Sequence, residues 1–159
     1  MPKTVNALKV SLPLTKASEI VDAALAAART HELEPLTVVV LDTGGHDVAL
    51  KREDGSGIIR VEIARAKAYG ALGMGLSSRG IGERLGQRPI FASSLTVISG
   101  GRLAVAAGGV LIKDGAGEVI GAVGISGDTS EKDELAAIKG IEAAGLMAEP
   151  REPDPRWNG

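Results

Sequence analysis

The apolar positions between residues 15 and 30 repeat with the period of an α-helix. They fall at i, i+3, i+4, i+7, i+8 and i+11, which places one apolar stripe along a single helix face. Thr15 stands where the N-cap of such a helix is expected. The pattern therefore predicts an amphipathic helix over 15–30, with these inward residues: Ala17, Ile20, Val21, Ala24, Leu25 and Ala28.

The next segment has the pattern of two strands. Residues 36–41 form a continuous apolar run rich in β-branched side chains, which is typical of a buried strand. The glycine-containing turn 42–47 follows, and residues 48–52 then alternate between apolar and polar side chains. A short turn between two such segments predicts an antiparallel hairpin.

The middle of the chain predicts helices. The apolar spacing over 58–72 indicates one helix, and Ser77 or Ser78 can cap a shorter one after it. Residues 87–89, Gln-Arg-Pro, end that shorter helix, because the residue before proline disfavours helical geometry. Residues 91–98 fit either a helix or a strand.

Glycines divide the following segment into short strands, and residues 114–117 have the chemistry of a hairpin turn. A final helix is predicted over 129–144, and Gly145 is placed where a left-handed C-terminal glycine is common. The predicted strands of this half cover residues 103–106, 110–113 and 119–125.

The order of elements is thus α-β-β-α-α-β-β-β-α. Because hairpins rather than long crossovers join most strands, the sequence predicts an α+β fold in which helices flank an antiparallel sheet of about five strands. Residues 1–148 are expected to form one domain, since a chain of 159 residues suits a single core. The proline-rich tail 149–159 is expected to be loose.

Composition narrows the possible functions. Eighteen Lys and Arg against twenty Asp and Glu give a net charge of −2, so the chain lacks the basic excess that nucleic-acid binding requires. The absence of cysteine excludes disulfides, thiolate metal sites and a cysteine nucleophile. No segment reaches the roughly 18 apolar residues of a membrane span, and no leader pattern opens the chain, so a cytoplasmic protein is expected.

The core must be built from small aliphatic side chains. The chain has 22 glycines, and its aromatic residues are Tyr69, Phe91 and Trp157 alone. Small residues bury little apolar area each, and burial between subunits often supplements such a core. The composition therefore predicts a homo-oligomer.

One group of candidate residues is basic. Arg52 ends a predicted strand, Asp54 lies in the next loop, and Arg60 and Lys67 are seven residues apart on one face of the following helix. Two cations beside an apolar surface could hold a carboxylate, such as a heme propionate or a small organic acid. Alternatively, Lys67 extends along the apolar surface to water, and Arg52 pairs with a neighbouring acid.

A second group precedes the last helix. The segment 127–134 leads from a buried strand into that helix and contains four acidic residues. Asp128 or Thr129 can cap the helix, and acidic side chains suit the positive end of its dipole. Capping needs only one or two of these residues, so a polar rim in which Asp128 contacts a ligand or moves a proton remains a second interpretation.

Histidine offers the third candidate. His46 lies in the polar turn 42–47, where it can serve as an axial iron ligand, as a proton carrier, or simply as a turn residue that contacts the backbone.

Several stretches, in matching order over about residues 15–147, resemble the GlcG/HbpS-like family. The resemblance lies in GGHDVA at 44–49 with REDG at 52–55, ARAKA at 64–68, GGVLI at 108–112, GAVGISG at 121–127 and DTSEKDE at 128–134. Leu111 stands where the family has proline in its G-G-x-P-I signature.

The resemblance implies a profilin-like or PAS-like fold and assembly into dimers or larger oligomers. Members of the family include heme-binding and heme-degrading proteins, a sensor partner, and proteins with no assigned activity, so the resemblance implies fold more narrowly than function. Residues of the matching motifs then become ligand-binding candidates together with Arg60 of the basic group: Arg52, Lys67, Gly109, Gly127, Asp128, Thr129 and Asp133.

Three functions remain open at this point. The first is binding of a tetrapyrrole, most simply heme, with His46 on the iron and Arg52 and Lys67 on the propionates. The second is a cofactor-free isomerase, tautomerase or lyase for a small carboxylated metabolite, with Asp54, Asp128 and Lys67 as the catalytic groups. The third is an oligomeric sensory or interaction partner without catalytic activity.

Overall fold

The computed structural model describes residues 1–2 and 4–159. It confirms an α+β fold with five antiparallel strands. In chain order the elements are α1 (Leu14–Thr30), β1 (Thr37–Asp42), β2 (Asp47–Arg52), α2 (Arg60–Met74), α3 (Ser78–Leu85), α4 (Pro89–Ile98), β3 (Gly109–Lys113), β4 (Val119–Ser126), α5 (Ser130–Ala143), β5 (Met147–Glu149) and a 3₁₀ turn, Pro155–Asn158.

The sheet has the strand order β2-β1-β4-β3-β5, and every neighbouring pair is antiparallel. Both hairpin turns, β1–β2 and β3–β4, therefore lie at the same end of the sheet, which we call the hairpin end. At the opposite end β2 leads toward α2 and β4 leads into α5. We call this the polar end.

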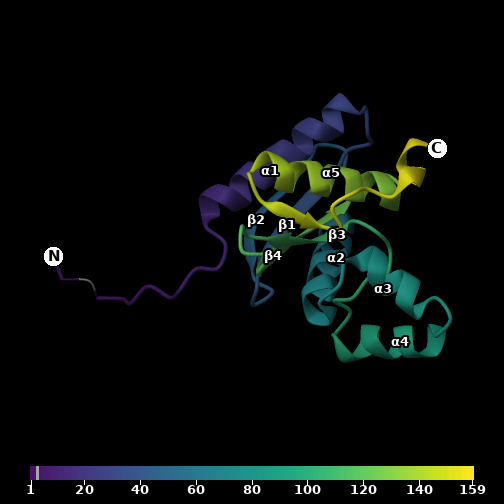
Figure 1. Ribbon diagram of the computed structural model, residues 1–159, viewed down its shortest axis with the longest axis horizontal. Helices are drawn as coiled ribbons and strands as arrows, with labels where there is room; N and C mark the ends of the chain where they lie inside the picture. The colour runs from purple at the N-terminus through teal and green to yellow at the C-terminus, as the bar shows by residue number, and fades with distance from the viewer. Residues whose placement is uncertain (3) are drawn as a thin grey trace.

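Helices cover both faces of the sheet (Figure 1). α1 and α5 lie on one face, whereas α2, α3 and α4 lie on the other. Alternation along β1 explains both layers, because Val38 and Val40 belong to the core beneath α1 and α5, and Val39 and Leu41 belong to the core beneath α2.

Glycine allows α2 to lie unusually close to the sheet. A Cβ atom on Gly124 of β4 would collide with the carbonyl group of Ala64, and one on Gly109 of β3 would collide with the carbonyl oxygen of Lys67. Ala68 completes this contact from the helix. Glycine inside a strand often marks a close approach of another backbone, and here the approaching element is α2.

The segment 103–106 is a loop, so the prediction of a strand there was wrong. Its backbone packs beneath helices, with Leu103 against Gly70 of α2 and Val105 against Gly82 of α3. β5 fills the place beside β3 instead. Residues 91–98, which fitted a helix or a strand, lie in α4.

Three of the four predicted helix ends are confirmed. Ser77 caps α3 through Gly80 N–H, Thr129 caps α5 through Lys132 N–H, and Gly145 has the left-handed φ of 76°. Thr15 is not the N-cap of α1, which begins at Leu14 after Pro13 and has no side-chain cap.

Part of the tail that was expected to be loose packs on the body. Glu149 pairs with Leu111 of β3, and Asp154 is buried, with its N–H donating to Glu134 of α5. The sheet thus extends one residue beyond the predicted boundary at 148, and the domain limits themselves stay a prediction.

Gly124→Ala should destabilise the protein, because its methyl group forces α2 away from β4. Overpacking of this kind costs about 1–3 kcal/mol, and a collision with rigid backbone should reach the upper part of that range. Urea unfolding measures the change. Gly73→Ala is the matched control, since nothing lies within 4 Å of its Cβ position on α2, and there alanine should stabilise by up to about 1 kcal/mol. Equal stability of the two variants would contradict the close approach.

Candidate functional site

At the polar end a lysine and an aspartate form a buried ion pair. The Lys67 ammonium donates to Asp133 Oδ2 at 3.0 Å and to the carbonyl oxygen of Ile125 at 2.9 Å. The two side chains are only 3% and 2% exposed. The close approach of α2 to β3 and β4 delivers Lys67 to this position. A buried pair of this kind is far more sensitive to loss of one partner than a surface pair.

Asp133 also organises the start of α5. Its second carboxylate oxygen, Oδ1, accepts the N–H of Asp128 at 3.0 Å. Burial raises the pKa of Asp133, and the charge of Lys67 together with this hydrogen bond opposes the rise. The side chain therefore ties α2, the end of β4 and the first turn of α5 into one unit.

Asp128 joins this unit to the loop before β1. Its Oδ2 accepts the N–H of Glu34 at 2.8 Å, and its Oδ1 accepts the N–H of Thr129 at 2.7 Å. Although partial burial works in the opposite direction, these backbone hydrogen bonds hold the pKa of Asp128 below its ordinary value. Both oxygens of the Asp128 carboxylate thus accept hydrogen bonds from the backbone.

A polar row crosses the same end of the sheet. Thr37 is paired in register with Arg52 on one side and Ser126 on the other. Arg60 donates to Ser126 Oγ at 3.1 Å, and the Thr37 and Ser56 hydroxyls are 2.8 Å apart. The Arg52 side chain is exposed.

Beside this unit lies a buried carboxylate that sequence reasoning did not identify. Glu134 has no exposed surface and accepts from Arg79 Nε at 3.1 Å and from Asp154 N–H at 2.9 Å. Burial raises the pKa of Glu134, against the hydrogen bond from Asp154 and the charge of Arg79. The sequence signal was present, because four acids exceed what helix capping needs, but it did not indicate which acid turns inward.

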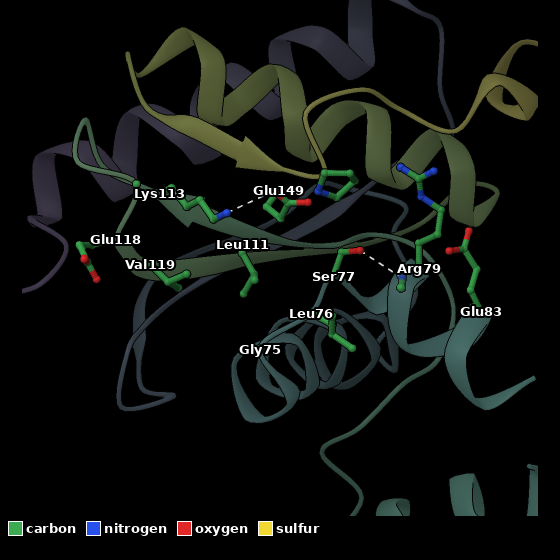
Figure 2. Close-up of a pocket in the computed structure, with 13 residues that line it drawn as sticks. Gly75, Leu76, Ser77, Arg79, Glu83, Leu111, Lys113, Glu118, Val119 and Glu149 are labelled. Carbon is green, nitrogen blue, oxygen red and sulfur yellow. Dashed lines mark hydrogen bonds and ion pairs between the residues drawn. The ribbon is translucent and has the colours of Figure 1, made fainter.

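A cavity of about 710 Å³ opens on the α2 side of the sheet (Figure 2). It lies between the start of α3 and the β3–β4 hairpin, and Leu111, the residue that replaces the family's proline, forms part of its wall. Lys113 donates to Glu149 across one side at 3.2 Å, while Arg79 is held by Glu134. Both cations of this cavity therefore already have carboxylate partners.

A second cavity, a groove of about 850 Å³, lies at the hairpin end. The β1–β2 turn and the segment before α1 form its walls, and His46 lies in it with 81% of its side chain exposed. The apolar side chains that line it are Leu8, Val10, Leu12, Leu14, Val48 and Val119.

Asp42 shapes the turn that carries His46. Its Oδ1 accepts the N–H groups of Gly44 and His46 at 2.9 and 3.1 Å, and it lies 3.5 Å from His46 Nδ1. This is an Asx turn, a pattern that the sequence Asp-Thr-Gly-Gly could have predicted. Because Nδ1 lies beside Asp42, Nε2 is the nitrogen on the opposite side of the ring.

The structure brings some predicted site residues together and separates others. Lys67, Asp128 and Asp133 meet at the polar end, close to Gly109 and Gly127, and Arg60 reaches the same region. Arg52 belongs to the same row. The Asp54 side chain is exposed and has no ion pair among residues 1–2 and 4–159, and the Thr129 hydroxyl caps α5 by accepting the Lys132 N–H.

His46 lies at the other end of β2 from Arg52. Six strand residues separate the two ends by about 17 Å, and neither cavity described above is lined by Arg52, Arg60 or Lys67. The ligand-binding and catalytic roles of the predicted residues stay predictions.

Among residues 1–2 and 4–159, no His, Cys, Asp and Glu side chains form a group of three that could hold a metal ion. None of the helices described is long and apolar enough to cross a membrane.

The protein is thus a small α+β domain whose antiparallel sheet has helices on both faces. A buried Lys–Asp pair lies at one end of the sheet, and a groove that contains a histidine lies at the other. Residues 12–142 match the family described as haem degrading protein HbpS-like. The match covers most of the chain, which therefore belongs to the HbpS-like family.

Solved structures agree with this assignment. The PduOC:heme complex superposes with a TM-score of 0.76 at 25% identity, covering 86% of this chain and 97% of that one. HbpS gives 0.72 at 25% identity, covering 87% and 93%. The ORFY protein of Klebsiella pneumoniae gives 0.75 at 22% identity, covering 91% and 97%, and supports the fold alone. A search of curated proteins found no match.

Lys67→Met should cost about 3–5 kcal/mol in the free energy of unfolding, because it leaves Asp133 buried without its counter-charge. The double variant Lys67→Met/Asp133→Asn removes both charges, and its amide oxygen can still accept the Asp128 N–H. We expect the double variant to be more stable than Lys67→Met in urea unfolding. A double variant of equal or lower stability would show that the charge pair is not what the fold depends on.

Asp128→Asn should destabilise the protein in a pH-dependent way. The pKa of Asp128 is lowered in the folded state, so its ionised form contributes stability at neutral pH, and this contribution disappears as pH falls through the folded-state pKa. Because the hydrogen bonds to this charged acceptor are weakened, the free energy of unfolding should fall by about 1–3 kcal/mol at pH 7. Urea unfolding at pH 7 and at pH 3 should show a smaller difference from wild type at pH 3; a difference that stays constant would contradict this assignment.

Proposed function

We propose that this protein binds heme, with the hairpin-end groove as the site and His46 as the iron ligand. The observation that carries the proposal is the exposed imidazole of His46 in a groove whose walls are largely aliphatic. Family membership and the neighbour solved as a heme complex support the choice of ligand.

The residues of the groove fit such a ligand. A volume of about 850 Å³ lies within the 300–1,000 Å³ typical of small-molecule sites. Aliphatic walls suit the faces of a porphyrin, for which aromatic stacking is not required. The contrast with His31 is informative, because that ring packs edge-on against Trp157 at 5.4 Å.

Asp42 would act as the positioning residue. A carboxylate beside Nδ1 fixes the imidazole tautomer and raises the basicity of Nε2, as carboxylate partners of metal-bound histidines generally do. The two N–H donors of the turn hold that carboxylate in place. Bound heme would supply iron-centred ligand exchange and redox chemistry, whose course the ligand and its surroundings tune.

Lys9 is the cation that lines this groove. We propose it, rather than Arg52 or Lys67, as the partner of a propionate at this site. Lys67 is committed to Asp133 and Ile125, and Arg52 lies at the far end of its strand. A carboxylate ligand that bound at the polar end would occupy a site separate from this groove.

Acid–base catalysis on a small carboxylated metabolite is the weaker alternative. Its candidate groups Lys67 and Asp128 are hydrogen-bonded to the protein itself, and Lys67 is almost fully buried. Binding of heme therefore accounts for more of the geometry. Self-association is proposed as well, on the strength of the small-residue core; the cytoplasmic location stays a prediction.

Hemin titration tests the proposed site. Wild-type protein should give a saturable shift of the Soret band, and His46→Ala should weaken binding by more than about tenfold, since removal of even an outer-shell partner of a metal ligand costs that much. His31→Ala is the control and should bind like wild type. Unchanged affinity and an unchanged Soret position in His46→Ala would refute His46 as the ligand, and a wild type without saturable binding would refute the function.

A further inference from the structure

α4 is an apolar helix that the rest of its own chain leaves uncovered. None of its ten residues is buried. Ile90, Val97 and Ile98 are 83%, 80% and 76% exposed. Together with Ser94 they occupy positions i, i+4, i+7 and i+8, which share one side of a helix. We call this side the α4 face.

The sequence around α4 carries no charge. No Asp, Glu, Lys or Arg occurs between Pro89 and Gly101. A helix of this length is marginally stable in water without tertiary contacts. α4 nevertheless touches chiefly α3, and it lies on the outer side of α2 and α3 away from the sheet (Figure 1).

No other described segment of the chain is in a position to cover the α4 face. The N-terminal segment, which also exposes apolar side chains, extends from the opposite side of the molecule (Figure 1). The C-terminal turn packs on α5. The α4 face is therefore open within the described part of the chain, and another molecule can cover it.

We propose that the α4 face docks against the same face of a second copy of this chain, the two helices being related by a two-fold axis that passes near Ser94. The proposal rests on the proposed self-association and names its surface. A two-fold axis brings the residues nearest to it close to their own copies, so a charge near the axis would meet a like charge. The charge-free stretch from Pro89 to Gly101 avoids that cost, and the small Ser94 lies between the larger apolar residues at the crossing point.

The ends of the helix suit an antiparallel pair. Arg88 stacks on Phe91 of its own chain at 4.4 Å, at the N-terminal end of α4. Antiparallel packing sets this cation near the C-terminal carbonyl groups of the partner helix, where positive charge is favourable. Arg102, at the other end, is held on the ring of Tyr69 at 4.2 Å.

A membrane surface is a poorer occupant. Helices that lie in a lipid interface combine an apolar face with a polar face rich in Lys and Arg, and α4 contains neither residue. A stable dimer buries about 800 Å² per partner, more than a helix about 15 Å long can supply alone. We therefore expect residues outside α4 to contribute to the interface.

The first test measures molar mass by light scattering after size exclusion. Wild type should elute as a multiple of 16.2 kDa, and Val97→Asp should lower that multiple while its circular dichroism and melting temperature stay close to wild type. Val5→Asp is the matched control, because Val5 is 79% exposed and Val97 80%. The control should keep the wild-type mass.

The second test uses the absence of cysteine in the chain. Ser94→Cys should form a covalent dimer under mild oxidation, because the axis brings the two residues together. Ser93→Cys, exposed but turned by about 100° around the helix, should form several-fold less.

The outcomes separate the surface from self-association itself. A monomeric wild type overturns both proposals. An oligomeric wild type whose mass Val97→Asp leaves unchanged, or equal crosslinking of Ser93→Cys and Ser94→Cys, overturns the α4 surface alone. A monomeric wild type that sediments with neutral phosphatidylcholine vesicles, and loses this with Val97→Asp, assigns α4 to lipid instead.

Discussion

The contact between α2 and the central strands is the constraint on which the rest of the structure depends. Because Gly109 and Gly124 have no side chains, the helix backbone rests almost directly on β3 and β4. Only at that distance can the Lys67 side chain reach both the end of β4 and Asp133 of α5. The ion pair is thus a consequence of small residues, and it fixes α5 relative to α2 across the edge of the sheet.

The two ends of the sheet differ in how their polar side chains are paired. At the polar end, charged side chains satisfy one another and the backbone, and burial leaves little of Lys67 or Asp133 for a ligand. At the hairpin end, His46 remains exposed beside aliphatic walls. The buried ion pair and the exposed imidazole thus lie at opposite ends of the sheet.

Sequence reasoning recovered most of the fold, because periodicity and turn chemistry are local signals. The hairpins, the caps at Ser77 and Thr129, and the strand pattern of residues 36–41 follow from nearest neighbours in the chain. The failure at residues 103–106 has a different origin. Those residues have a strand-like composition, but their backbone packs against glycines of α2 and α3. The position beside β3 in the sheet is taken by β5.

The sequence by itself determined the α+β class, the antiparallel hairpins, the need for a tightly packed core of small residues, and the family. Only the tertiary structure decided which charges are partners: it joined Lys67 to Asp133 over 66 positions, buried Glu134, and separated His46 from Arg52. The physical reason is that ion pairing and burial depend on distances through space, which packing sets, whereas helix caps, turns and periodicity depend on residues only a few positions apart.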